Sequence, residues 1–156
     1  MPMKVYKKIL LALLIVVVAI QFFKPAHNSS REVLPADITK VVNIPDNMLN
    51  NFKNSCYDCH SNNTRYPWYV YIQPMGWLMA SHIKEGKANL NFSEFGTYST
   101  RKQANKLRAI SSSIKDGSMP ILAYTVMHTN AKLSKANKEL IISWASKTRD
   151  SLLAKD

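Results

Sequence analysis

Both cysteines of the chain lie in one short stretch, Cys56-Tyr57-Asp58-Cys59-His60. Two thiols separated by two residues, with a histidine directly after the second, form the pattern by which a c-type haem is attached. A single turn of backbone gives about the separation that two thiols need to reach two vinyl groups on one edge of a porphyrin. The following imidazole then lies under the iron. We therefore expect Cys56 and Cys59 to hold one covalent haem c, with His60 as the proximal iron ligand.

Three other uses of the motif stay open at this point. A thioredoxin-like redox pair would need a βαβ pattern around the two cysteines, and none is visible. A structural zinc site needs four ligands, which His60 and another histidine could complete. A disulfide between the two cysteines would close a very small ring and would restrict the unfolded chain only modestly.

Residues 1–25 combine a basic flank with an unbroken apolar run, Ile9 to Ile20. A basic start, an apolar middle and a polar exit are typical of an export signal. The run is short for a membrane span, which needs roughly 20 residues, but no small-residue cleavage site follows it. We expect an uncleaved anchor in the bacterial cytoplasmic membrane, with a cleaved signal peptide as the alternative. The remainder of the chain would then lie outside that membrane, in the periplasm.

Residues 26–44 contain Ser, Asn and Pro without sustained periodicity, and we expect them to be a linker that holds the domain away from the membrane. Residues 45–156 are expected to form one helical domain. The scarcity of glycine, with 4 in 156 residues, fits helices better than a β-sandwich. Helices are expected from a cap at Asp46 into the cysteine motif, from about Met75 to Lys87, from Ser99 or Thr100 to Asp116 before Gly117, and from a cap at Ser134 onward.

A second iron ligand is expected at Met119, which lies between a helix end and Pro120. The proline restricts Met119 to an extended backbone, which could aim the thioether at the iron. His82, on a partly apolar helix face, is the alternative distal ligand, and His128 is less favoured. Arg65 and Trp68 could contact the haem propionates.

The stretch from about residue 45 to 150 resembles the bacterial haem-binding domain family, whose members are single-haem relatives of cytochrome c. The resemblance implies an all-α, cytochrome c-like fold around one haem and, usually, an N-terminal membrane anchor. It extends over the cysteine motif with Ser61-Asn62, over Tyr66-Pro67-Trp68-Tyr69, His82-Ile83-Lys84-Glu85-Gly86-Lys87, Leu90-Asn91-Phe92-Ser93-Glu94-Phe95, Gly117-Ser118-Met119-Pro120, Leu133-Ser134 and Ile142-Ser143-Trp144-Ala145.

The formal net charge of +11 suits docking to acidic redox partner proteins, and no nucleic-acid-binding motif accompanies it. We expect an electron carrier rather than an enzyme, because two axial ligands would leave no open position on the iron. The alternatives are a haem-based sensor or ligand-binding module with a displaceable distal ligand, and a peroxidase-like enzyme that uses His82 or His128 as acid and base.

Overall fold

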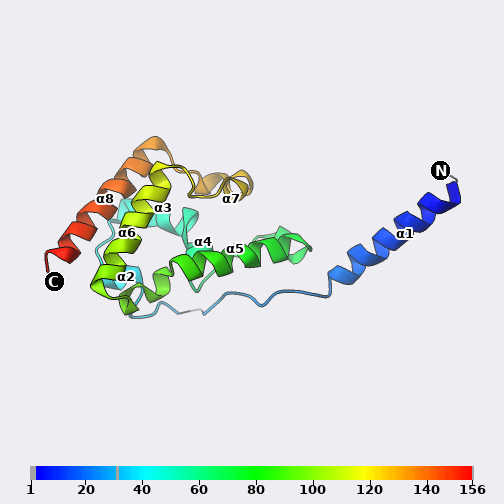
Figure 1. The fold of residues 1–156 in the computed structure, drawn as a ribbon, viewed down its shortest axis with the longest axis horizontal. Helices are drawn as coiled ribbons and strands as arrows, with labels where there is room; N and C mark the ends of the chain where they lie inside the picture. Colours follow the sequence, from blue (N-terminus) through cyan, green and yellow to red (C-terminus); the bar gives the residue numbers. More distant parts are fainter. Residues whose placement is uncertain (1–2, 31, 156) are drawn as a thin grey trace.

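A computed structural model describes residues 3–30 and 32–155 of the chain. Among these residues there is no β-strand, only an isolated bridge between Ser29 and Asn63. The expected all-α class is thus confirmed (Figure 1). The α-helices and 3-10 helices (η) are, in order, α1 Met3–Ile20, α2 Ile38–Val41, α3 Asp46–Ser55, α4 Tyr57–His60, η1 Trp68–Tyr71, α5 Met75–Asn89, η2 Phe92–Thr97, α6 Thr100–Lys115, α7 Leu122–Met127, η3 Thr129–Ala131 and α8 Lys135–Leu153.

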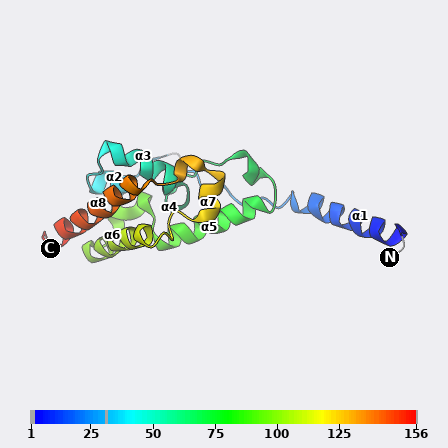
Figure 2. The ribbon, with the colours of Figure 1, turned by 90° about the horizontal axis from the view of Figure 1, so that it is seen from above.

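Helix α1 projects from one end of the helical domain, and the C-terminus lies at the opposite end (Figures 1 and 2). From Lys4 to Ala19 every residue of α1 is exposed. In the part of the chain that the structure describes, no helix has both the length and the apolarity needed to cross a membrane. The structure therefore gives no support to a membrane-spanning anchor, although it does show an exposed apolar helix over the expected run.

The segment expected to be a free linker packs against the domain instead. Ile38, on α2, is completely buried, and Val42 and Ile44 are also part of the core. Nearer the N-terminus, the side chain of Asn28 donates hydrogen bonds to the backbone oxygen of Ser61 at 2.7 Å and to the hydroxyl of Thr64 at 2.9 Å. The domain boundaries stay a prediction, but Asn28, Ile38, Val42 and Ile44 are in contact with the helical domain.

The larger hydrophobic core lies between α3, η2, α6 and α8. Phe52 is fully buried, and its ring meets those of Phe92 at 5.6 Å and Trp144 at 5.3 Å, both edge-on. Burying one such side chain contributes about 1.5 to 3 kcal/mol. The indole N–H of Trp144 donates to the backbone oxygen of Asn43 at 2.8 Å, so it carries no unpaired polar group into the core. This packing fixes α3, and therefore the cysteine motif that follows it.

A smaller buried cluster joins η1, α5, α7 and η3, and includes Val70, Met79, Ile83 and Tyr124. In Figures 1 and 2, α7 lies on the side of the domain that is nearer to α1 than α6 and α8 are. The two clusters thus form two separate parts of the interior, and the cavity described below has walls from both.

The residues that begin and end the long helices are mostly those expected from the sequence. Ser99 caps α6 and Ser134 caps α8 through their side-chain oxygens. Gly117 follows the end of α6 with a φ of 79°, a left-handed conformation that glycine adopts without strain. The expected cap at Asp46 is wrong by one residue, because Asp46 is already helical and Pro45 precedes it without a side-chain hydrogen bond.

Candidate functional site

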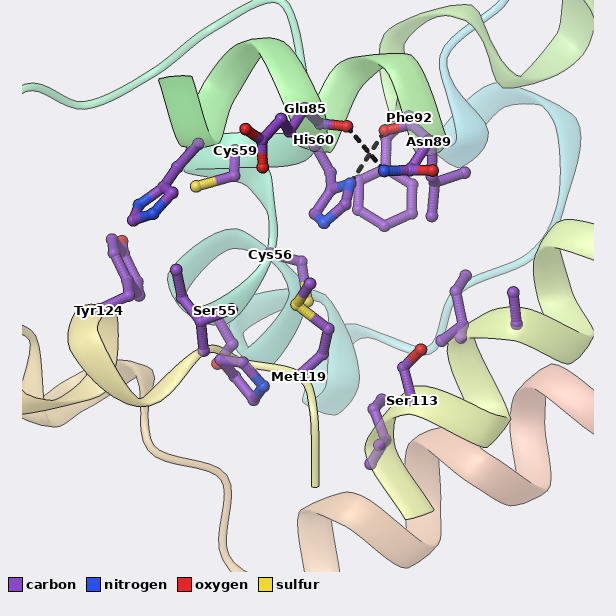
Figure 3. A pocket seen from close by; sticks show the side chains of 18 of the residues that line it. Ser55, Cys56, Cys59, His60, Glu85, Asn89, Phe92, Ser113, Met119 and Tyr124 are labelled. Carbon is purple, nitrogen blue, oxygen red and sulfur yellow. Dashed lines mark hydrogen bonds between the residues drawn. The ribbon is translucent and has the colours of Figure 1, made fainter. Parts of the chain in front are cut away.

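A cavity of about 410 Å³ lies between the cysteine motif, α5, α6 and the segment that leads into α7. This volume is within the usual range of cofactor pockets, about 300 to 1,000 Å³. The wall is mostly apolar and carries residues of both clusters, such as Phe92 and Tyr124. The five residues expected to attach the haem or to bind its iron all line this one cavity, namely Cys56, Cys59, His60, His82 and Met119. Figure 3 labels Cys56, Cys59, His60 and Met119 around it. Their roles stay predictions, but the fold brings them together.

The imidazole of His60 is oriented by the backbone of Leu90, the residue that ends α5. The carbonyl oxygen of Leu90 lies 3.0 Å from Nδ1, and because a carbonyl only accepts, Nδ1 carries the proton. The other nitrogen, Nε2, keeps its lone pair for a metal, an arrangement that metal-binding histidines commonly have. Burial lowers the pKa of His60 and thus favours the neutral ring. The His60 ring faces the cavity in Figure 3.

The two thiols stand one helical turn apart. The backbone N–H groups of Cys59 and His60 both donate to the carbonyl oxygen of Cys56, at 3.2 and 3.0 Å. Both cysteines are free thiols. Burial raises the pKa of Cys56 to about 12 and that of Cys59 to about 11, so both are protonated at neutral pH. Two thiols at one turn's separation on the wall of an apolar cavity fit the attachment of a porphyrin edge.

Helix α5 approaches the motif very closely because it has a glycine at the crossing point. A Cβ atom placed on Gly86 would lie 2.5 Å from the backbone oxygen of Cys59, a contact that real Cβ atoms essentially never make. The approach also brings Leu90 to His60. Gly86 therefore has a packing role at the site, and nothing in the motif itself pointed to it.

Met119 and His82 reach the cavity from different sides. His82 belongs to α5, the helix that packs directly on α4. Met119 belongs to the segment after α6, and its side chain, 39 % exposed, points toward the space that the His60 ring faces (Figure 3). Its backbone N–H donates to the carbonyl oxygen of Ser113 at 3.0 Å, which ties the segment to the last turns of α6.

His128, the least favoured distal candidate, does not line this cavity. Its ring stacks on Tyr124 with centroids 4.1 Å apart. Its Nδ1 lies 3.1 Å from the backbone oxygen of Tyr124 and its Nε2 lies 3.3 Å from the hydroxyl of Tyr69. Both nitrogens are thus engaged away from the cavity.

Asp58, between the two cysteines, is a buried carboxyl that ties the motif to α7. Its Oδ2 accepts a 2.5 Å hydrogen bond from the hydroxyl of Tyr124, and its Oδ1 lies 3.3 Å from Nε of Arg65. Arg65 also donates to the backbone oxygen of Lys53 at 2.6 Å. Burial, together with the hydrogen bond to Asp58, raises the pKa of Tyr124 well above its usual range. The motif is thus held by Asp58 and Tyr124, to which the sequence analysis gave no role, and by Arg65, which it expected at the haem propionates.

The two residues expected to contact haem propionates lie elsewhere. The guanidinium of Arg65 is used by Asp58 and the end of α3, and Trp68 is 73 % exposed; neither lines the cavity. Lys106, on α6, is instead the only lysine or arginine among the described residues that line it. Its ammonium group is the one on this wall that could pair with a carboxylate.

A bare metal ion is a different case from haem. Within the described ranges, no three His, Cys, Asp or Glu side chains are grouped so that they could hold a metal ion. A structural zinc site needs four such ligands. In haem, the porphyrin supplies four nitrogen ligands to the iron, and the protein supplies the axial ligands and an apolar pocket. The donor set and cavity found here fit the second requirement.

The fold and this cavity define a small all-α domain of the haem-binding class. The model of the family described as Haem-binding domain matches residues 15–147 of the chain. The chain therefore belongs to the haem-binding domain family. No curated protein and no solved structure matches it. The match begins within α1 and includes residues 28–44, in keeping with the packing of that segment on the domain.

Proposed function

We propose that the protein is a monohaem c-type cytochrome that transfers single electrons outside the cytoplasmic membrane. The observation that carries the proposal is the arrangement around His60. Its Nδ1 donates to the carbonyl oxygen of Leu90 at 3.0 Å, which leaves a lone pair on Nε2, and the thiols of Cys56 and Cys59 line the same cavity. Haem supplies a centre that accepts and releases one electron, and the protein supplies its attachment, orientation and surroundings.

We propose Met119 rather than His82 as the distal ligand, because the second axial ligand must approach from the face opposite His60. His82 lies on α5, which is packed against the helix that carries His60. Met119 comes from the segment after α6, across the cavity. A thioether raises the potential of the iron relative to a second imidazole. Lys106 is proposed to pair with a haem propionate from the α6 side.

We propose further that α1 attaches the protein to the membrane, with the domain on the periplasmic side. The support is an exposed helix whose side chains from Ile9 to Val18 are almost all large and apolar, preceded by Lys4, Lys7 and Lys8. Apolar surface of this extent is rarely left in water, and the lysines can extend to the headgroups.

Acidic redox proteins are the proposed partners, because the chain carries a net charge of +11.

The test of covalent attachment is a denaturing gel of the exported, purified protein stained for haem. Wild-type protein should keep its pigment through denaturation, and the double variant Cys56→Ala/Cys59→Ala should lose it. His128→Ala is the control, since His128 is outside the cavity, and should retain pigment. If the wild-type chain comes off the gel colourless after loading with haem, the c-type assignment is wrong, although non-covalent haem binding could still hold.

A second candidate, a haem-based sensor or ligand-binding module, is favoured by one observation. Met119 is 39 % exposed and lies in a short segment between α6 and α7, so an external ligand could displace it. Carbon monoxide binding to the reduced protein distinguishes the two functions. An electron carrier with two firmly bound axial ligands should bind carbon monoxide slowly and weakly. A sensor with a displaceable ligand should bind it rapidly and tightly.

A further inference from the structure

Six large apolar side chains between residues 68 and 78 are exposed, on η1, on the start of α5 and on the turn between them. The stretch that contains them, from Tyr66 to Ile83, has no Asp, Glu, Lys or Arg. Trp68 is 73 % exposed and Trp77 is 40 % exposed. Exposed apolar surface of this kind marks an interaction site. We name this surface the uncharged patch, and it consists of Trp68, Tyr71, Ile72, Met75, Trp77 and Leu78.

Trp77 of the uncharged patch and the neighbouring Gln73 are joined by hydrogen bonds to the residues directly after α1. The indole N–H of Trp77 donates to the backbone oxygen of Phe23 at 2.7 Å. The backbone N–H of Gln73 donates to the side-chain oxygen of Gln21 at 2.8 Å. Phe22 and Phe23 are themselves 82 % and 70 % exposed. Figures 1 and 2 both show α1 leaving the domain at the end where α5 begins. The patch therefore continues the apolar surface of α1 onto the domain.

The composition of the patch suits the boundary between water and lipid. Tryptophan and tyrosine concentrate at membrane interfaces, where their rings are half apolar and half polar. Two lysines border this surface, Lys84 after the patch in the sequence and Lys24 beside Phe23. Arg65, before the patch, is already paired with Asp58. Basic residues at such a border are attracted by anionic headgroups. A protein partner would not require the patch to be continuous with an apolar helix.

We propose that the uncharged patch rests on the lipid bilayer, so that the domain lies against the membrane surface beside α1. Trp68 and Trp77 then occupy the headgroup layer, and the cavity is held at a constant height above the membrane. This inference rests on the membrane attachment proposed for α1, and it adds a second contact that the helix alone does not require.

The test uses the full-length, haem-loaded protein in vesicles of phosphatidylcholine and phosphatidylglycerol. A fraction of the lipid carries a photoreactive diazirine near the headgroup end of its acyl chain, and mass spectrometry maps the cross-linked residues. We expect cross-links over residues 68–78 as well as in α1. The double variant Trp68→Glu/Tyr71→Glu should lose most of the cross-links over 68–78 and keep those in α1. Leu153→Glu is the matched control, because Leu153 is 50 % exposed on α8 near the C-terminus, and should change neither.

The outcomes separate this inference from the attachment on which it rests. Cross-links in α1 alone would overturn the inference, leave the membrane attachment standing, and assign the patch to a protein partner or a second copy of the chain. Cross-links in neither region would overturn both. The wild-type map answers the question by itself, so it does not depend on the folding of any variant.

Discussion

The hydroxyl of Tyr124 donates a 2.5 Å hydrogen bond to the buried carboxyl of Asp58, which stands between the two cysteines of the haem motif. The two residues are 66 positions apart in the sequence, and their hydrogen bond joins α7 to α4. Tyr124 also lines the cavity. The hydroxyl of Tyr124 therefore both stabilises the helical domain and helps to fix the position of the cysteine motif.

We expect Tyr124→Phe to lower the free energy of unfolding by about 1.5 to 3 kcal/mol, the usual contribution of a hydrogen bond to a charged group. The substitution leaves Asp58 with one partner fewer in a buried position. Urea denaturation followed by circular dichroism measures the change. Tyr71→Phe is the control, because Tyr71 is 49 % exposed, and should stay within about 0.5 kcal/mol of wild type. Equal stability of both variants would contradict the role assigned to this bond.

The stability of the haem-loaded protein should fall at alkaline pH. Burial raises the pKa of Tyr124 above its usual range, with the hydrogen bond to Asp58 as the next cause, and burial likewise raises the pKa of Tyr57 beside Asp37. Below about pH 10 both phenols are protonated in the folded and the unfolded chain. Above it the unfolded chain releases protons that the folded chain retains, so the free energy of unfolding decreases as the pH rises.

Urea denaturation between about pH 8 and about pH 11 tests this pH dependence. Tyr124→Phe, although less stable throughout, should lose less stability over this interval than wild type, because it lacks one of the two groups. An identical slope for the variant would show that Tyr124 ionises equally in both states.

Gly86→Ala should disrupt the site even though alanine is the better helix former by about 1 kcal/mol. The added Cβ would lie 2.5 Å from the backbone oxygen of Cys59, so α5 must move away from α4 and take Leu90 from His60. We expect a net destabilisation of about 1 to 3 kcal/mol and reduced haem loading, measured as the ratio of Soret to protein absorbance. Ala88→Ser, at an exposed position of the same helix, is the control and should load normally.

Met119→Ala should remove the thioether-to-iron charge-transfer band from the near-infrared spectrum of the oxidised protein, because no other methionine lines the cavity among the described residues. Met127→Ala, on the exposed side of α7, is the control and should keep the band. His82→Ala should keep it as well. Persistence of the band in Met119→Ala would refute the proposed ligation.

Much of the helical order follows from local chemistry that a sequence displays. Ser99, Gly117 and Ser134 act within one turn of their own positions, and the cysteine motif depends on one turn of spacing. Such features need no knowledge of what packs against them. The sequence analysis found the cap at Ser134 and the end at Gly117, and gave Ser99 as one of two candidate caps of α6.

Features that depend on distant partners were missed or misplaced. The role of Asp58 could be assigned only by knowing that Tyr124 donates a hydrogen bond to it. The role of Gly86 could be assigned only by knowing where α5 crosses the cysteine motif. Arg65 was expected at the haem because its charge suits a propionate, but a buried carboxyl seven residues away competes for the same guanidinium. The sequence between Asn28 and Ile44 shows no sustained periodicity, because its contacts are scattered: Asn28 binds Ser61 and Thr64, and Ile38, Val42 and Ile44 enter the core.

The hydrogen bonds of Gln21, Phe23 and Asn28 leave hardly any slack chain between the apolar helix and the domain. With α1 attached to a membrane, as proposed above, the haem site would be held close to the membrane surface. An electron donor or acceptor would then have to diffuse to it in the plane of the membrane or reach it from the adjoining solution.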